Sequence, residues 1–222
     1  MAQDTAGNAG MTVAVIDMGS NSFRLQISKV ISGTYKIIED YKEVLRIGDV
    51  VYSTGGFTEE AIKRVIATLK RMQIFMENNA VDAYRLVGTA PFRDAYNSAE
   101  LLKTVKEELG FDIDVISGEE EARLIYLAAS GYFNLTDINA IFVDIGGGST
   151  ELSYSVDADL AESITTTLGC SRITQKFVAK QKAKQEEISK LKKQMKKTMR
   201  TIIDTDAIDK LAFTGGTVNS LA

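Results

Sequence analysis

Two segments of the chain end an apolar run in an aspartate and continue in small residues. Ala14–Ser28 reads AVIDMGSNSFRLQIS, and Ile141–Ser155 reads IFVDIGGGSTELSYS. Glycines let backbone N–H groups approach an anion closely, and hydroxyls add further donors, so each loop suits a phosphate group. The carboxylates of Asp17 and Asp144 would repel that phosphate unless a cation lay between them. We therefore expect Mg²⁺, held directly or through water.

A constant offset of 127 residues relates the two segments without a gap. Five of the fifteen aligned positions are identical, and they include the pairs Asp17 with Asp144 and Ser22 with Ser149. The alternative is a chance similarity between two hairpins. Identities at chemically matched places favour a duplication. Two such loops facing each other would hold a phosphate chain and leave its end open to attack.

A third chemical segment, residues 117–127, reads SGEEEARLIYL. Its carboxylates fit the first turn of a helix, because Ser117 and Glu120 match a capping box and acids there complement the helix dipole. Glu121 instead precedes two apolar residues by three and four positions, so it shares the face that turns inward. A carboxylate aimed between two lobes would have a raised pKa and would accept a proton from water. Spacing alone leaves both interpretations open.

Two more segments are candidates for binding an anion. Residues 89–97, TAPFRDAYN, join a strand to a helix and present Arg93, whose guanidinium makes bidentate contacts to phosphate oxygens. An ion pair with Asp94 or another nearby acid is an equal alternative. Residues 212–222, AFTGGTVNSLA, predict a strand, a double glycine and the start of a helix. Such a turn is either a simple connection or a phosphate cradle, formed here by Gly215, Gly216 and Thr217.

The residue types that are missing exclude several classes of enzyme. The sequence has no histidine and one cysteine. Acid–base chemistry near neutral pH therefore needs a carboxylate, lysine, tyrosine or thiol, and hydrolases that pair serine or cysteine with histidine are excluded. Zinc sites built on histidine are also excluded, and one cysteine cannot supply the thiolates of a structural zinc site. A single cysteine fits a reducing cytoplasm. The sequence has no apolar run of about 18 residues, so we expect no membrane span, and the first ten residues do not resemble a secretory signal. We expect a cytoplasmic protein without a membrane partner.

The order of the elements predicts a repeated α/β architecture. The pattern predicts strands at 12–18, 23–30, 35–45, 84–88, 112–116, 140–145, 150–156, 159–166 and 210–214, and helices at 58–79, 98–109, 117–130 and 176–200. Three strands followed by helix–strand alternation occur twice, which predicts two similar lobes with mixed sheets. We expect a flexible tail over residues 1–11, a first lobe over 12–130 and a second lobe over 131–222.

Positive charge is concentrated in one of these predicted helices. Residues 176–200 contain ten Lys or Arg and two Glu, whereas the whole chain has a net charge of −4. Apolar residues recur there at steps of three and four, which predicts an amphipathic helix. Its basic face is either simply solvated or a wall beside a polyanion. The acidic net charge and the scarcity of aromatics in this stretch, where Phe177 is the single one, argue against a nucleic-acid partner.

Taken together, these motifs resemble the exopolyphosphatase/guanosine pentaphosphate phosphatase (Ppx/GppA) family from Thr12 to the last residue. The resemblance is carried by AVIDMGSNSFRL, GTAPFRDAYN, ISGEEEARLIYL, FVDIGGGSTEL, TLGCSRIT and FTGGTVNSLA. It implies an actin-like ATPase fold with two ribonuclease-H-like lobes and a cleft between them. Members of the family usually continue past the last motif, so we expect the second lobe to be C-terminally incomplete.

The resemblance also implies roles for individual residues. The glutamate before Ala-Arg, here Glu121, would be the catalytic base, and Asp17 and Asp144 would help to place Mg²⁺. Arg93 would bind phosphate near the scissile bond. The residues implied to hold phosphate on the two loops are Ser20, Asn21 and Ser22 on the first, with Gly146, Gly147, Gly148 and Ser149 on the second.

The activity implied is hydrolysis of a terminal phosphoanhydride, in inorganic polyphosphate or in guanosine pentaphosphate (pppGpp). The partner implied is inorganic polyphosphate or a guanosine penta- or tetraphosphate. An alternative is a module that binds polyphosphate or alarmone with little turnover. A sugar or acetate kinase of the same fold is a third hypothesis, against which GSNS and GEEEAR weigh. The sequence permits a homodimer without requiring one.

Overall fold

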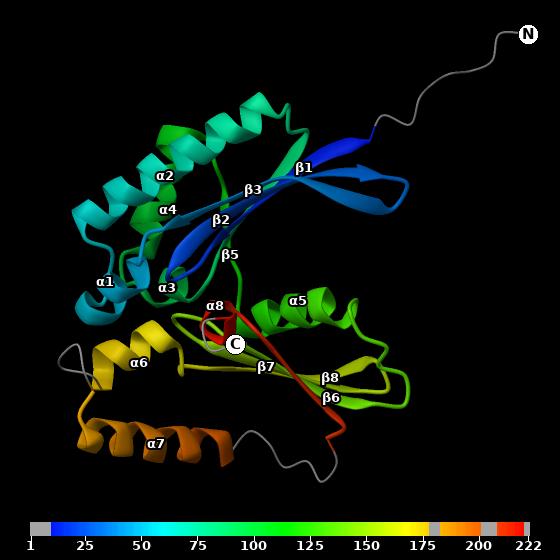
Figure 1. The fold of residues 1–222 in the computed structure, drawn as a ribbon. Coiled ribbons are helices and arrows are strands. Elements are labelled where there is room, and N and C mark those ends of the chain that lie inside the picture. Colours follow the sequence, from blue (N-terminus) through cyan, green and yellow to red (C-terminus); the bar gives the residue numbers. More distant parts are fainter. Residues whose placement is uncertain (1–9, 178–182, 201–207, 220–222) are drawn as a thin grey trace, which may run out of the picture.

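The computed structural model describes residues 10–177, 183–200 and 208–219, and Figure 1 shows them as two stacked halves. The first half consists of β1 (Met11–Met18), β2 (Ser22–Ile31), β3 (Thr34–Val44), α1 (Ile47–Thr54), α2 (Glu59–Asn78), β4 (Ala83–Gly88), α3 (Ala90–Asp94), α4 (Ser98–Leu109) and β5 (Ile113–Val115). The second half consists of α5 (Gly118–Ser130), β6 (Asn139–Ile145), β7 (Thr150–Val156), β8 (Asp159–Thr166), α6 (Cys170–Phe177), α7 (Gln185–Arg200), β9 (Lys210–Thr214) and α8 (Gly216–Asn219).

The two sheets share one topology. The first has the strand order β3-β2-β1-β4-β5, and the described part of the second has the order β8-β7-β6-β9. In each, the first hairpin is antiparallel and its leading strand pairs in parallel with a later strand, β1 with β4 and β6 with β9. Even the irregularities repeat, because a register shift lies between Ile27 and Ser28 and another between Tyr154 and Ser155, 127 residues later. The predicted duplication of mixed-sheet lobes is confirmed.

The first half has a large apolar core on one face of its sheet. α2 and α4 cover that face (Figure 1), and Val65 and Leu69 of α2 pack with Ile16 and Met18 of β1 without solvent exposure. α2 begins where the sequence predicts, because the hydroxyl of Thr58 accepts a hydrogen bond from the N–H of Ala61. The opposite face of this sheet turns toward the second half.

The second half has a smaller core beneath α5. Tyr126 and Ala129 of α5 pack with Phe142 of β6, and the Tyr126 and Phe142 rings meet edge to face with centroids 5.4 Å apart. The hydroxyl of Ser153 on β7 also donates to the carbonyl of Ala122. α5 therefore packs on the second sheet, whereas a boundary at residue 130 places it with the first lobe. The chain order suggested that boundary, but the side chains of α5 match the apolar surface of β6 and β7.

Three short helices differ from the sequence-based expectation. α1 and α3 have no side-chain cap, and all three helices are at most eight residues long, so their local signal is weak. The helix predicted over 176–200 is instead the end of α6 and the separate helix α7, with residues 178–182 outside the described part. Residues 1–9 of the predicted tail also lie outside it, and Met11 is already the first residue of β1.

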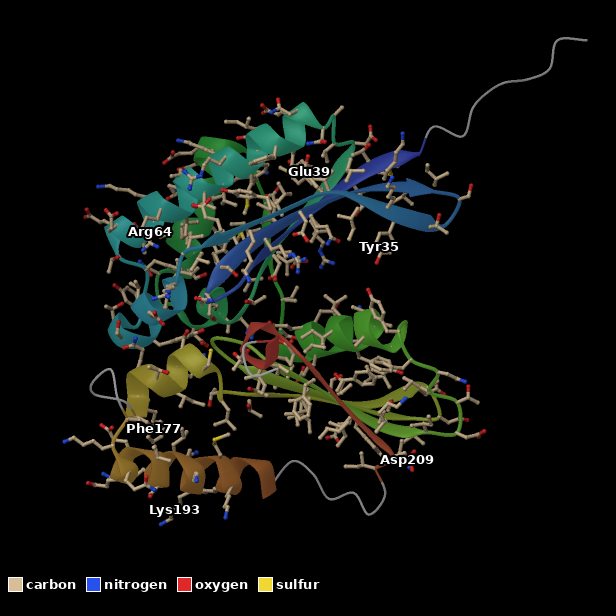
Figure 2. The ribbon with its side chains drawn as sticks, in the orientation of Figure 1. Tyr35, Glu39, Arg64, Phe177, Lys193 and Asp209 are labelled. Atoms are coloured by element: carbon tan, nitrogen blue, oxygen red, sulfur yellow. The ribbon has the colours of Figure 1, made fainter. Side chains whose placement is uncertain are left out.

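α7 lies at the edge of the molecule. Figure 1 shows α6 between α7 and the first half, and Figure 2 shows Lys193 on the outer side of α7. Within the described residues, no helix combines the length and the apolar character needed to cross a bilayer.

Candidate active site

The loop between β1 and β2 is held by the start of α1. The carbonyl of Ser20 accepts a hydrogen bond from the N–H of Gly48 at 2.8 Å, and the carbonyl of Asn21 accepts from Leu45 and Arg46 at 2.9 and 2.8 Å. The turn is closed by the N–H of Gly19, which donates to the carbonyl of Ser22. The carbonyls of Ser20 and Asn21 are therefore occupied by the segment that leads into α1.

The loop between β6 and β7 is held in the same way by the start of α6. The N–H groups of Cys170 and Ser171 donate to the carbonyls of Gly146 and Gly147 at 2.9 and 2.8 Å. Within the part of the chain that the structure describes, the N–H groups of Gly147 and Gly148 form no hydrogen bond. Each half therefore uses the first turn of a helix to hold the carbonyls of its loop. This arrangement leaves amide groups to meet an anion.

The two loops touch each other. A Cβ placed on Gly147 would lie 2.8 Å from the Cβ of Ser20, and one on Gly148 would lie 2.7 Å from the hydroxyl of Ser20 and 1.9 Å from that of Tyr52. The Ser20 hydroxyl is also 2.8 Å from the Tyr52 hydroxyl, so it faces α1. Of the loop residues singled out in the sequence, Ser20 and Ser149 are buried, whereas Asn21 is exposed. Glycine at 147 and 148 is thus required by the close approach of the two halves.

The two aspartates at the strand ends are close enough to influence each other. Asp17 has exposed surface yet is surrounded by protein, a combination that places it in a recess. Desolvation, followed by the charges of Glu121 and Asp144, raises the pKa of Asp17 to about 6, and the charges of Arg24 and Lys42 oppose the rise. The carboxylates of Asp17 on β1, Glu121 on α5 and Asp144 on β6 are therefore close enough for their charges to interact.

Glu121 lies on the first turn of α5 and bonds to Arg93 of α3. One carboxylate oxygen accepts a hydrogen bond from Nη1 of Arg93 at 2.8 Å, and the same nitrogen donates to the carbonyl of Ile116. Glu121 keeps only 18% of its side chain exposed. Burial raises the pKa of Glu121, the contact with Arg93 opposes this, and the charge of Asp144 adds to it. Arg93 pairs with Glu121 and not with Asp94.

The N-terminal end of α5, which carries Glu121, is held by a side-chain cap and by close packing on β8. The hydroxyl of Ser117 accepts from the N–H of Glu120 at 3.1 Å, as the capping box predicts. The Glu120 carboxylate does not return that bond and instead pairs with Arg123. Gly118 packs so closely on β8 that a Cβ would lie 2.3 Å from the side chain of Thr165. This contact sets the depth at which Glu121 enters the space between the halves.

Glu151 is a member of this acidic cluster that we did not predict. It follows Thr150 on β7, is paired in register with Asp144, and is 1% exposed. The hydroxyl of Thr165 donates to its Oε1, but Oε2 is buried without a partner. Burial raises the pKa of Glu151 to about 7, the charges of Glu121 and Asp144 contribute to the rise, and hydrogen bonds from Ser149 and Thr165 oppose it.

A signal for Glu151 was present in the repeat. The offset of 127 residues aligns Glu151 with Arg24, and both are paired in register with the aspartate of their own half. Arg24 forms an exposed ion pair with Asp40, whereas Glu151 is buried. A reversal of charge at equivalent positions therefore marks where the halves differ in chemistry.

The double-glycine turn lies beside Asp144. The hydroxyl of Thr214 donates to the Asp144 carboxylate at 2.5 Å, and Gly215 has φ +96, a conformation that favours glycine. The hydroxyl of Thr217 points to the sulfur of Cys170 at 3.5 Å. This turn holds Asp144 in place, and the sequence motif had left open whether it only connects two elements.

The carboxylates suit Mg²⁺ only in part. No group of three or more metal-binding side chains converges within the described residues. Mg²⁺ in phosphate-binding sites is commonly held by one or two carboxylates, with waters and phosphate oxygens as the other ligands. Asp17 and Asp144, with the unpartnered buried oxygen of Glu151 nearby, fit that pattern.

The fold and the paired loops define an α/β protein of the actin-like ATPase type. The same fold is found in the PilM–PilN type IV pilus biogenesis complex, with a TM-score of 0.62 at 10% identity over 93% of this chain and 82% of that chain. The model of the Ppx/GppA phosphatase family matches residues 26–219. The chain belongs to this family of phosphatases.

Two solved structures illustrate the similarity. The Ppx/GppA family member from Aquifex aeolicus is 31% identical, with a TM-score of 0.76 over 96% of this chain and 68% of that chain. An exopolyphosphatase from Cytophaga hutchinsonii ATCC 33406 is 26% identical, with a TM-score of 0.89 over 96% of this chain and 69% of that chain.

Proposed function

We propose that this protein releases the terminal phosphate of inorganic polyphosphate by the attack of a water molecule that Glu121 deprotonates. One observation carries the proposal: two loops with their carbonyls held inside the protein lie against each other, close to the pair formed by Glu121 and Arg93. Membership of the Ppx/GppA phosphatase family and similarity to an exopolyphosphatase support it.

The loops and Arg93 would bind the phosphate chain. The free N–H groups of Gly147 and Gly148 are donors fixed by the backbone, so they lose little entropy on binding an anion. Arg93 adds a charged fork whose other donors remain available while Nη1 contacts Glu121. Phosphoryl transfer depends chiefly on such positioning and on neutralising charge.

Glu121 would act as the general base. Its raised pKa makes it a stronger base than an exposed glutamate, while the hydrogen bond and the charge of Arg93 oppose the rise and favour the ionised form that accepts a proton. The water proton goes to the Glu121 carboxylate as the water oxygen bonds to the terminal phosphorus. The bridging P–O bond then breaks, and its electron pair leaves with the shortened chain.

Asp17 and Asp144 would hold Mg²⁺, whose charge neutralises phosphate oxygens when it is bound. The raised pKa of Asp17 agrees with this role, because the cluster of negative charge would be relieved by a cation. The Asp144 carboxylate is oriented by Thr214 and is therefore in place before any ligand arrives.

The decisive experiment compares Glu121→Gln with Glu120→Gln. The neighbouring Glu120 pairs with Arg123 and takes no part in the proposed reaction, so it controls for the loss of a carboxylate from the same helical turn. With Mg²⁺ and long-chain polyphosphate, we expect E121Q to lower kcat by roughly 10²- to 10⁴-fold while substrate is still bound. E120Q should remain near wild type. Unimpaired turnover by E121Q would refute the role of Glu121.

The same assay separates the alternatives. Guanosine pentaphosphate is tested beside polyphosphate, because both present a terminal phosphate next to further anions. Binding of either compound without phosphate release would indicate a binding module. A requirement for a nucleotide donor would indicate a kinase.

A further inference from the structure

Arg172 of α6 makes three contacts that the proposed reaction does not use. Its Nε donates to the carbonyl of Gly148 at 2.7 Å, its guanidinium pairs with Asp94 of α3, and it stacks on the ring of Tyr52 with its central carbon 4.2 Å from the ring centroid. Asp94 and Tyr52 belong to the first half, whereas Gly148 belongs to a loop of the second. One side chain therefore joins both halves and a phosphate loop.

The ion pair between Arg172 and Asp94 also helps to hold the neighbouring Arg93 in position. Among the residues that the structure describes, two ion pairs cross between the halves, Arg93 with Glu121 and Asp94 with Arg172. Arg93 and Asp94 are consecutive residues of α3, a helix of five residues. The position of α3 is thus fixed from two sides, and a shift of Asp94 would move Arg93 away from Glu121.

Tyr52 extends the same cluster to the other phosphate loop. Its hydroxyl is 2.8 Å from the Ser20 hydroxyl, and it lies where a Cβ of Gly148 would be. Burial raises the pKa of Tyr52 to about 12, so this hydroxyl remains protonated. Arg172 and Tyr52 together contact both loops.

An open pocket of about 480 Å³ lies beside the cluster, between Val51 of α1 and Gln175 of α6, and Arg172, Asp94 and Tyr52 form part of its wall. The contacts of Arg172 therefore lie at a place where the two halves border a solvent-accessible hollow.

We propose that Arg172 is a positioning residue that holds the two halves closed, so that the Gly148 loop and Arg93 face the same phosphate group. This inference rests on the proposed function of the two loops. Without Arg172, the Gly148 carbonyl loses its hydrogen bond and α3 loses one of its two ion pairs with the second half. Substrate affinity therefore falls more than the rate of the bound complex.

The test uses Arg172→Met, with Arg71→Met as its control. Arg71 forms a bidentate pair with Glu43 inside the first half, so R71M removes a similar contact without touching the interface. We expect R172M to raise KM for tripolyphosphate and Kd for pyrophosphate roughly tenfold or more, since a charge-assisted hydrogen bond is lost. We expect kcat to change less, and R71M to match wild type.

A distance measurement reports on closure independently of catalysis. Spin labels are placed at Lys63→Cys on α2 and Glu162→Cys on β8, which are exposed positions in opposite halves, with Cys170 replaced by serine. R172M should lengthen or broaden the distance distribution. Arg172→Lys should keep the pair with Asp94 and restore the distance, but not the affinity, because lysine lacks the guanidinium fork.

The outcomes are distinguishable. Unchanged pyrophosphate affinity and an unchanged distance distribution in R172M would overturn the proposal. If R172M does not fold, Asp94→Asn removes the ion pair alone, and the same two measurements decide. Absence of phosphate release by the wild-type protein would refute the proposed function, whereas pyrophosphate binding and the distance measurement would still test Arg172.

Discussion

Replacing Glu151 by glutamine isolates the cost of ionising a buried carboxylate. Burial, together with the charges of Glu121 and Asp144, raises the pKa of Glu151 from 4.5 to about 7. A carboxyl with a higher pKa in the folded state binds more protons there than in the unfolded chain. The free energy of unfolding therefore falls as pH increases from about 4.5 to about 7, and the loss is complete above that range.

The magnitude follows from the two pKa values. Each pKa unit corresponds to about 1.4 kcal/mol, so ionising Glu151 costs up to roughly 3 kcal/mol at pH 8. The side chain is 1% exposed, so solvent screens little of this cost. Glutamine keeps an acceptor for the hydroxyl of Thr165 and has no charge to bury. We expect Glu151→Gln to be more stable than wild type at pH 8 and close to it at pH 4.5.

The assay is thermal unfolding at both pH values with a chelator present. For a chain of this length, 3 kcal/mol corresponds to a rise in Tm of several degrees, up to roughly 10 °C. Glu120→Gln is the control, because the pair with Arg123 lowers the pKa of Glu120 and this variant gains nothing at pH 8. An E151Q protein that is less stable than wild type at pH 8, or equally shifted at both pH values, would refute the reasoning.

Three more predictions concern the site and its surroundings. Because burial raises the pKa of Glu121, kcat should decline on the acidic side at a pH above the 4.5 of an ordinary glutamate; full activity down to that pH would contradict this. Gly148→Ala should lower stability by roughly 1–3 kcal/mol and reduce phosphate release, because its Cβ would meet the Tyr52 hydroxyl at 1.9 Å. Calorimetry should show that adding Tyr52→Phe to Gly148→Ala restores part of the lost stability. The control Gly131→Ala, whose Cβ has only ordinary contacts, should keep the stability of the wild type. Lys193→Glu on the outer side of α7 should leave the KM for tripolyphosphate unchanged. If this substitution raises the KM at low salt, α7 does contact the substrate.

The local features of the fold could be read from the sequence because their causes are local. Thr58 and Ser117 cap helices through their own neighbours three residues on, and Gly110 ends α4 in the left-handed conformation with φ +73. The repeat was visible because both halves need an aspartate and a tight turn at the end of a buried strand. It also anticipated the common strand order and the approach of the two loops.

The assignment of α5 could not be made in this way. Its apolar face is compatible with either sheet, and chain order favours the first. Only the fit of Tyr126 against Phe142, and of Gly118 against Thr165, determines which sheet it covers. Glu151 was missed for a related reason, because a glutamate after a strand start is usually exposed and its burial depends on β8 and α5.

By itself, the sequence determined which chemistry is available: carboxylates and small-residue loops in two copies, no histidine, and one arginine between a strand and a helix. Tertiary structure alone decided which of these groups meet. The contact of Ser20 with Gly148 and the ion pair of Asp94 with Arg172 join residues far apart in the chain. Such contacts leave no periodic pattern in the sequence, since they arise from packing α1 against α6 and depend on the shapes of both surfaces at once.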